Sequence, residues 1–62
     1  TITEDTMREL FLGRQGAAKK TLALELQEMT GCSRTSAYDA LKLSGRFNEH
    51  LRDNDGLLRW ES

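Results

Sequence analysis

The sequence predicts a mainly α-helical fold of three helices, followed by a small β-hairpin near the C-terminal end. Two observations support this prediction. Between residues 3 and 43, apolar residues recur at helical spacing in three segments, each bounded by capping residues or glycine. After residue 46 the pattern changes, because an Asp-Gly turn signal is flanked by apolar residues at alternating positions, as in two paired strands.

The first predicted helix covers residues 3–12. Thr3 can cap its first turn, and two acids follow where the helix dipole favours negative charge. Met7, Leu10 and Phe11 recur at i, i+3, i+4, so we expect them on the buried face.

The second predicted helix starts after Thr21, which can cap its first turn, and ends at Gly31. Glycine is common at this place because it adopts the left-handed conformation at little cost. The expected buried face consists of Leu22, Leu26 and Met29, and Leu24 lies off this line and broadens it.

A loop over residues 16–20 leads into the second helix and ends with two lysines, Lys19 and Lys20. We expect both lysines to lie on this loop, directly before the helix cap. At this position they either contact a phosphate backbone or are solvated lysines with no partner.

The third predicted helix is capped by Ser33, extends through Lys42 and stops by Gly45. Its inward positions recur at i, i+3, i+4, and the two alanines among them allow close packing on the preceding helix. The residues expected to face inward are Ala37, Ala40 and Leu41. Those expected to face outward, at least in part, are Arg34, Thr35, Tyr38, Asp39 and Lys42.

The segment TGCSRTSAYDALK resembles the turn and recognition helix of the helix-turn-helix and winged-helix DNA-binding families. The matching positions are Gly31, Cys32, Ser33, Arg34, Thr35, Tyr38 and Leu41. Gln27 departs from the pattern, since these families commonly have alanine four residues before the turn glycine. It either loosens the helix crossing or points outward. The resemblance implies a three-helix winged helix-turn-helix, with a very short strand before the second helix that pairs with the wing.

Residues 47–60 are expected to contain the wing. Asp53–Gly56 is a strong turn signal, and Leu51, Leu58 and Trp60 alternate so that they can point inward. A competing interpretation makes residues 47–52 a short helix, because Phe47 and Leu51 are four apart. In both interpretations Trp60 and Phe47 belong to the core.

Length and charge limit what the chain can do. With 62 residues, 37% hydrophobic and 31% charged, it forms one small domain over residues 1–62. The chain begins at Thr1 rather than methionine, so we expect a domain excised from a longer protein. The net charge of −1 argues against strong binding to nucleic acid irrespective of sequence. Positive charge is concentrated before the second helix and on the third.

The sequence lacks the motifs of catalytic and metal sites, so we expect no enzymatic activity, cofactor or metal. The single cysteine, Cys32, excludes an internal disulfide and suits a reducing cytoplasm, where we expect the protein to be. His50, the only histidine, is interpreted as a polar surface residue. Asp53 and Asp55 lack the downstream glutamate of a calcium loop. No apolar run is long enough to cross a bilayer, and no membrane partner is expected.

The first functional hypothesis, based on the resemblance, is binding of double-stranded DNA through residues 33–42, as a transcription-regulatory or replication-associated module. The fork of Arg34 matches guanine in the major groove. Asp39 either accepts from cytosine or tethers Arg34 or Lys42. Asn54 is placed on the wing with two arginines. The expected DNA-binding residues are Lys19, Lys20, Ser33, Arg34, Thr35, Ser36, Tyr38, Lys42, Arg46, Arg52 and Arg59.

The second hypothesis is a protein-interaction or dimerisation module that does not bind DNA. Its partner is a second copy of the chain or another domain of the parent protein. The near-zero net charge favours it. A surface patch formed by Leu24, Leu43 or Leu57 favours association, whereas a basic third helix without exposed apolar residues favours DNA.

Overall fold

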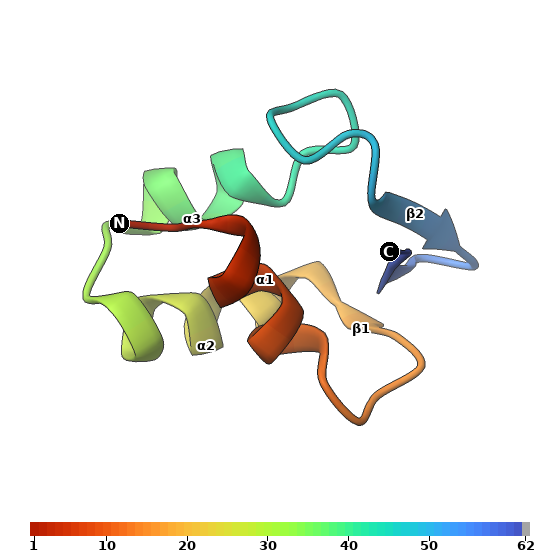
Figure 1. Cartoon of the computed structure of the whole chain (residues 1–62), viewed down its shortest axis with the longest axis horizontal. Coiled ribbons are helices and arrows are strands. Elements are labelled where there is room, and N and C mark those ends of the chain that lie inside the picture. Colours follow the sequence, from red (N-terminus) through yellow and green to blue (C-terminus); the bar gives the residue numbers. More distant parts are fainter. Residues whose placement is uncertain (62) are drawn as a thin grey trace.

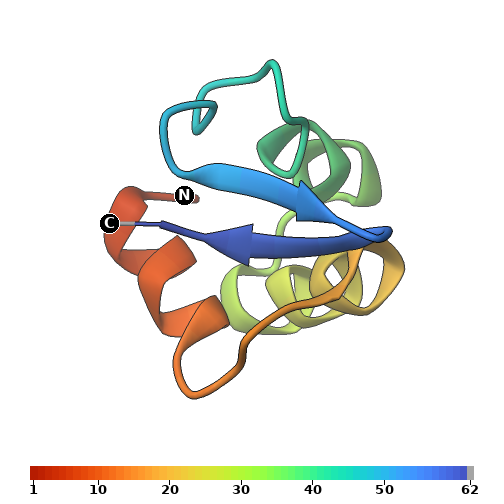
Figure 2. The same ribbon diagram turned by 90° about the vertical axis from the view of Figure 1, so that its right-hand side faces the viewer.

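A computed structural model describes residues 1–61 as three helices and a three-stranded antiparallel sheet (Figure 1). The predicted fold, mainly α with a small β component, is confirmed, and the arrangement is compatible with a winged helix. Figure 2 looks onto the sheet, with the helices beside and behind it. In chain order the elements are α1 (Glu4–Phe11), β1 (Ala17–Ala18), α2 (Lys19–Thr30), α3 (Arg34–Ala40), β2 (Leu51–Asn54) and β3 (Leu57–Trp60).

The sheet has β3 in the middle, in the order β1-β3-β2. The hairpin turn is Asp55-Gly56, whose φ angles of 55° and 81° are both positive, as the type I′ hairpin turn requires. Strand β1 is only two residues long and pairs Ala17 with Leu58 and Ala18 with Leu57. The short strand that the resemblance implied before the second helix is therefore present.

Helix α1 forms as predicted. The side chain of Thr3 accepts a hydrogen bond from the backbone N–H of Thr6 at 3.2 Å, which caps the first turn. Met7, Leu10 and Phe11 are buried, as expected from their spacing.

Helix α2 starts earlier than predicted, at Lys19, and the expected cap at Thr21 is wrong. The N-cap is Ala18, which makes no side-chain hydrogen bond and has an extended backbone. Ala18 is also the last residue of β1, so pairing with β3 brings the chain directly from strand into helix. Lys19 and Lys20 consequently lie in the first turn of α2 rather than on a loop.

The buried face of α2 also differs from the prediction. Leu22 and Leu26 are fully buried, but Met29 is 42% exposed and Leu24 is 55% exposed. Ala23 is buried instead. Because Ala23 is buried, the centre of the buried face of α2 lies further from Met29. Met29, in the last turn, is therefore at the edge of this face and partly exposed.

The turn between α2 and α3 follows the sequence prediction. Gly31 has a φ of 71° and donates its N–H to the carbonyl of Gln27 at 2.8 Å, which ends α2. Ser33 caps α3 by accepting from the N–H of Ser36. The residues expected to face inward in the third helical segment are buried, namely Ala37, Ala40 and Leu41.

Helix α3 is shorter than predicted, because it ends at Ala40 and Lys42 lies outside it. The N–H of Leu41 donates to the carbonyl of Tyr38 at 3.1 Å and that of Lys42 to the carbonyl of Asp39 at 3.3 Å, so turns closed over three residues, as in a 3₁₀-helix, replace the α-helical bonds. The predicted stop at Gly45 is therefore a few residues too late.

The chain reaches the hairpin through a series of turns. Phe47 accepts backbone bonds from His50 and Leu51, each at 3.0 Å, which makes one closed turn rather than a helix over residues 47–52. The hairpin interpretation is confirmed, with β2 starting at Leu51.

Trp60 at the end of β3 fastens the hairpin to the helices. Its ring stacks on Phe11 of α1 at 6.0 Å between centroids and meets Phe47 edge-on at 5.8 Å. His50 stacks on the other side at 4.5 Å, and its Nδ1 lies 2.7 Å from the carbonyl of Glu61. His50 is thus a partly exposed polar residue, as expected, whose ring also packs against Trp60.

Substituting Leu26 tests this core. Leu26 is 0% exposed, so Leu26→Ala removes buried methyl groups and leaves a cavity. We expect the free energy of unfolding to fall by about 2–5 kcal/mol, which is comparable to the total stability of so small a domain. Leu12, which is 79% exposed, provides the control. In urea unfolding, a loss at Leu12→Ala as large as at Leu26→Ala contradicts this assignment of the core.

Candidate nucleic-acid interface

Two cationic side chains lie near one aromatic ring where α2 and α3 meet, and a third cation lines the groove beside them. The Nζ atom of Lys19 lies 5.8 Å from the ring centroid of Tyr38, and the Cζ atom of Arg34 lies 5.7 Å from it. Lys20 lines the same shallow groove between the two helices as Arg34 and Tyr38. We call Lys19, Lys20, Arg34 and Tyr38 the basic cluster.

The start of α2 makes this location favourable for anions. The first turn contains Lys19 and Lys20 and no acid. The N-cap residue, Ala18, has no side-chain acceptor for the free backbone N–H groups of this turn. Unpaired N–H groups and the helix dipole give the amino end of a helix a partial positive charge. The two lysines add to this charge instead of cancelling it.

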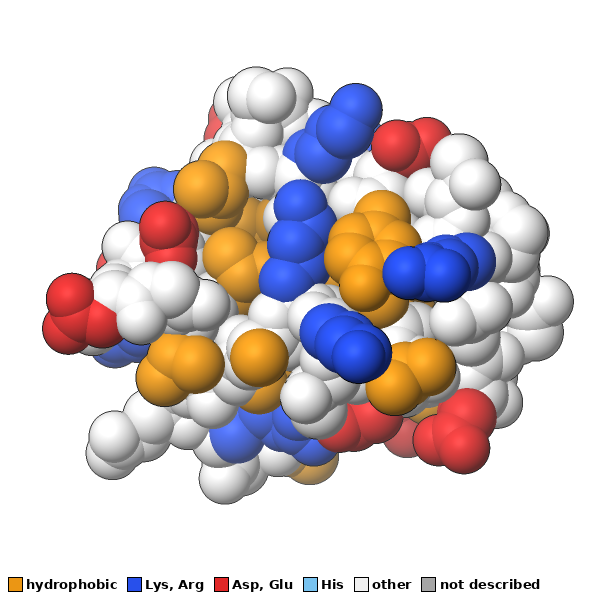
Figure 3. Space-filling model, turned by 180° about the vertical axis from the view of Figure 1, so that it is seen from behind, with side chains coloured by type: hydrophobic (Ala, Val, Ile, Leu, Met, Phe, Trp, Pro, Cys, Tyr) orange, Lys and Arg blue, Asp and Glu red, His pale blue; other side chains and the backbone are white. Residues whose placement is uncertain are grey.

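Most other cations are paired with carboxylates. Arg8 contacts Glu4 at 2.6 Å and Asp5 at 2.8 Å, and Arg14 contacts Glu25 at 2.7 Å. Within residues 1–61, Lys19, Lys20 and Arg34 form no salt bridge. Figure 3 shows a face on which lysine and arginine side chains gather near the centre, while acids lie toward the margins. The charge of the basic cluster is therefore available to a partner.

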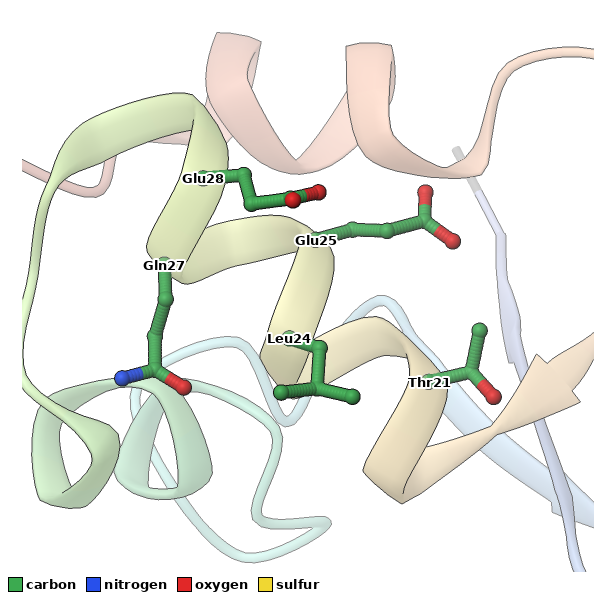
Figure 4. Close-up of a pocket in the computed structure, with 5 residues that line it drawn as sticks. All are labelled: Thr21, Leu24, Glu25, Gln27 and Glu28. Atoms are coloured by element: carbon green, nitrogen blue, oxygen red, sulfur yellow. The ribbon is translucent and has the colours of Figure 1, made fainter.

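The acids of α2 point away from α3. Figure 4 shows Glu25 and Glu28 extending on the side of α1, whereas Gln27 extends toward α3. Leu24 and Thr21 complete the shallow pocket between these side chains. Helix α2 thus separates an acidic side from the side that carries the basic cluster.

The hydroxyl groups at the start of α3 are partly occupied. The Oγ atom of Ser33 accepts from the N–H of Ser36 at 3.1 Å and lies 3.0 Å from the Ser36 Oγ. Thr35 is exposed. Of the predicted polar side chains at this end of the helix, Arg34 and Thr35 are the ones free to contact a partner directly.

Three of the other predicted binding residues are engaged within the domain. Lys42 lies 3.6 Å from Asp39, so that aspartate is placed to tether Lys42 rather than Arg34. The guanidinium of Arg46 donates to the carbonyl of Ile2 and lies 4.8 Å from the Phe47 ring centroid. The remaining engaged residue is Arg52, which contacts Glu61 at 3.5 Å and donates to the carbonyls of Asn48 and Leu51.

Arg59 lies apart from the basic cluster, on the hairpin. It sits directly opposite Arg52 in the pairing of β2 with β3. It is exposed, and it borders a shallow pocket with Gln15 and Asn54. Unlike Arg52, Arg59 forms no salt bridge within the described part of the chain.

Sequence reasoning missed Leu24 and Gln27, which line the groove beside Arg34 together with the buried Ala23. A signal for them exists, because Lys20, Leu24 and Gln27 follow one another at i, i+4, i+7 and share a face of α2. The interpretation of Leu24 as a broadening of the core concealed this face. Gln27, for which the sequence allows two interpretations, leans toward α3 at the groove and is half-buried.

Comparison with models of known protein families, with curated proteins and with solved structures found no match for this chain. Among residues 1–61, no three His, Cys, Asp or Glu side chains cluster so that they could hold a metal ion. None of the helices over these residues combines the length and apolar character that a membrane span needs.

Substituting Ser33 tests its structural role. We expect Ser33→Ala to lower the free energy of unfolding by about 1 kcal/mol, because the cap of α3 is lost. Thr35→Ala is the matched control, since Thr35 is exposed and two residues further along. Chemical unfolding of both variants decides the point. Equal losses would show that the cap does not stabilise α3.

Proposed function

We propose that this domain binds double-stranded DNA as a winged helix-turn-helix module, with the amino-terminal half of α3 in the major groove. The observation that supports this most is the basic cluster. Its three cations form no salt bridge within residues 1–61, and they lie where the start of α2 meets the start of α3, the second helix of a helix-turn-helix layout. We propose a role in transcription regulation or DNA replication, and we assign the domain no catalysis of its own.

In this proposal, Arg34 reads the DNA sequence. It is the first residue of α3 and is exposed, and its fork of donors matches the two acceptors of guanine in the major groove. Thr35 beside it can contact a base edge. Lys19 and Lys20 contact phosphates, which fixes the position of α3 without reading sequence.

The hairpin adds a second point of contact. Arg59 and Asn54 are exposed side chains of β3 and β2, and they flank one shallow pocket. We propose that they reach the DNA backbone beside the major groove. Contacts by Lys42, Arg46 and Arg52 require exchange of the partners that they have within the domain.

A titration with DNA tests the proposal at residue level. Amide signals are followed by NMR while a short random-sequence duplex is added at low and at moderate salt. We expect shifts at Lys19, Lys20, residues 33–42 and the hairpin. We expect these shifts to become smaller at higher salt, because the affinity falls. If three phosphates are neutralised, a plot of log affinity against log salt concentration has a slope of about −3. The absence of shifts at low salt would overturn the proposal.

Two substitutions separate sequence reading from phosphate binding. We expect Arg34→Ala to cost about 1–3 kcal/mol on a preferred duplex recovered by site selection and to relax its specificity. Lys20→Ala should weaken all duplexes alike and reduce the salt slope by about one. The control is Arg8→Ala, which removes one positive charge on α1, where Arg8 is paired with Glu4 and Asp5. Equal losses on preferred and random duplexes for Arg34→Ala and Lys20→Ala contradict these roles.

A second candidate function is association with protein, and exposed leucines favour it. Leu24 is 55% exposed, and Leu43 and Leu57 are each 45% exposed. In Figure 3, however, hydrophobic side chains form separate groups with lysine and arginine side chains among them, rather than one continuous patch. Sedimentation equilibrium distinguishes the two functions, because a self-associating module gains mass with concentration whereas a DNA-binding monomer does not.

A further inference from the structure

We propose that Tyr38 is a positioning residue that holds Lys19 and Arg34 at fixed places on the DNA-binding surface. The inference rests on the proposed function and adds a residue that acts through two others. Its basis is a geometry that joins two helices, since Lys19 belongs to α2, and Arg34 and Tyr38 belong to α3.

The ring of Tyr38 is itself held in place. Tyr38 is half-buried and packs against the core cluster, so one part of the side chain is fixed while the rest reaches the groove. An aromatic side chain has two rotatable χ angles and is stiff once its base is packed. It can therefore serve as a fixed reference for flexible neighbours.

Both cations lie within the range of a favourable interaction with this ring. The distances of 5.8 Å for Lys19 Nζ and 5.7 Å for Arg34 Cζ fall within the roughly 6 Å over which a ring attracts a cation. Neither cation forms a salt bridge within residues 1–61, so the ring is the partner that the structure gives them.

This arrangement has a consequence for binding. Long lysine and arginine side chains lose rotamer freedom when they are immobilised on a partner, and this loss opposes association. A ring that already restricts them reduces the loss without neutralising their charge. In contrast to an aspartate or glutamate, Tyr38 leaves both charges free to meet phosphate or guanine.

The test uses two substitutions at one position. Tyr38→Leu keeps an apolar side chain against the core and removes the ring face. Tyr38→Phe keeps the ring face and removes the hydroxyl. We expect Tyr38→Leu to lower affinity for a short random-sequence duplex about tenfold at low salt, with an unchanged salt slope because no charge is lost. Tyr38→Phe should restore most of the affinity.

A comparison with Lys19→Ala makes the readout specific. That variant removes a charge and should reduce the salt slope by about one, which Tyr38→Leu should not do. Equal thermal midpoints of the Tyr38 variants and the parent chain exclude unfolding as the cause. A salt slope reduced in Tyr38→Leu as in Lys19→Ala would overturn the inference.

A measurement without DNA separates this inference from the proposed function. Protons above an aromatic face resonate upfield, so the side-chain methylene signals of Lys19 and Arg34 should be shifted upfield in the parent chain and in Tyr38→Phe, and not in Tyr38→Leu. Unshifted signals in the parent chain overturn the inference even if DNA binds. Upfield signals without any duplex binding overturn the proposed function and leave the geometry established.

One further outcome decides between positioning and direct contact. If Tyr38→Phe loses as much affinity as Tyr38→Leu while its methylene signals remain shifted upfield, the hydroxyl contacts DNA directly. That result overturns the assignment of Tyr38 as a positioning residue.

Discussion

The pairing of β1 with β3 is the constraint on which the arrangement of the helices depends. Two residue pairs, Ala17 with Leu58 and Ala18 with Leu57, join the segment after α1 to the last strand of the chain. Because Ala18 is extended in the sheet, α2 cannot include it, and the helix begins at the next residue. The hairpin, which comes last in sequence, thus determines where the second helix starts.

This constraint has an electrostatic consequence. A helix that began after Thr21 would leave the two lysines on a loop, where their positions would be variable. The early start places Lys19 and Lys20 in the first turn of α2, at its positive end. Such a first turn is unfavourable for the isolated helix, because cations are stabilised at the other end. The sheet and the buried leucines Leu22 and Leu26 offset this cost.

The rest of the charged surface is largely neutralised. Arg8, Arg14, Lys42 and Arg52 each lie beside a carboxylate, and several of these pairs are exposed and contribute little to stability. Their effect is to leave the basic cluster as a local concentration of positive charge on a chain whose net charge is −1. A localised charge of this kind favours one orientation on a polyanion over indiscriminate attachment.

Much of the candidate site follows from local sequence. Thr3, Ser33 and Gly31 act on neighbours within a few residues, so the caps and the turn between α2 and α3 were predictable. The end of α3 was not, because the sequence marks Gly45 as the stop, whereas i→i+3 turns begin at Leu41 and Gly45 packs back against α3, where a Cβ would lie 3.1 Å from the carbonyl of Asp39. Sequence also predicted that Arg46 and Arg52 bind DNA, but it did not show the partners that they have within the domain. Arg46 donates to the carbonyl of Ile2, and Arg52 contacts Glu61 and donates to the carbonyl of Asn48.

By itself the sequence determined the three helices, the hairpin turn and most of the core, since hydrophobic periodicity and turn residues act locally; the short strand β1 followed only from the family resemblance. Tertiary structure decided the start of α2, the exposure of Met29 and Leu24, and the meeting of Lys19, Arg34 and Tyr38. Strand pairing between residues some forty positions apart sets the first of these. The others depend on which face of a helix its neighbours cover, and that information lies in the packing of all three helices together.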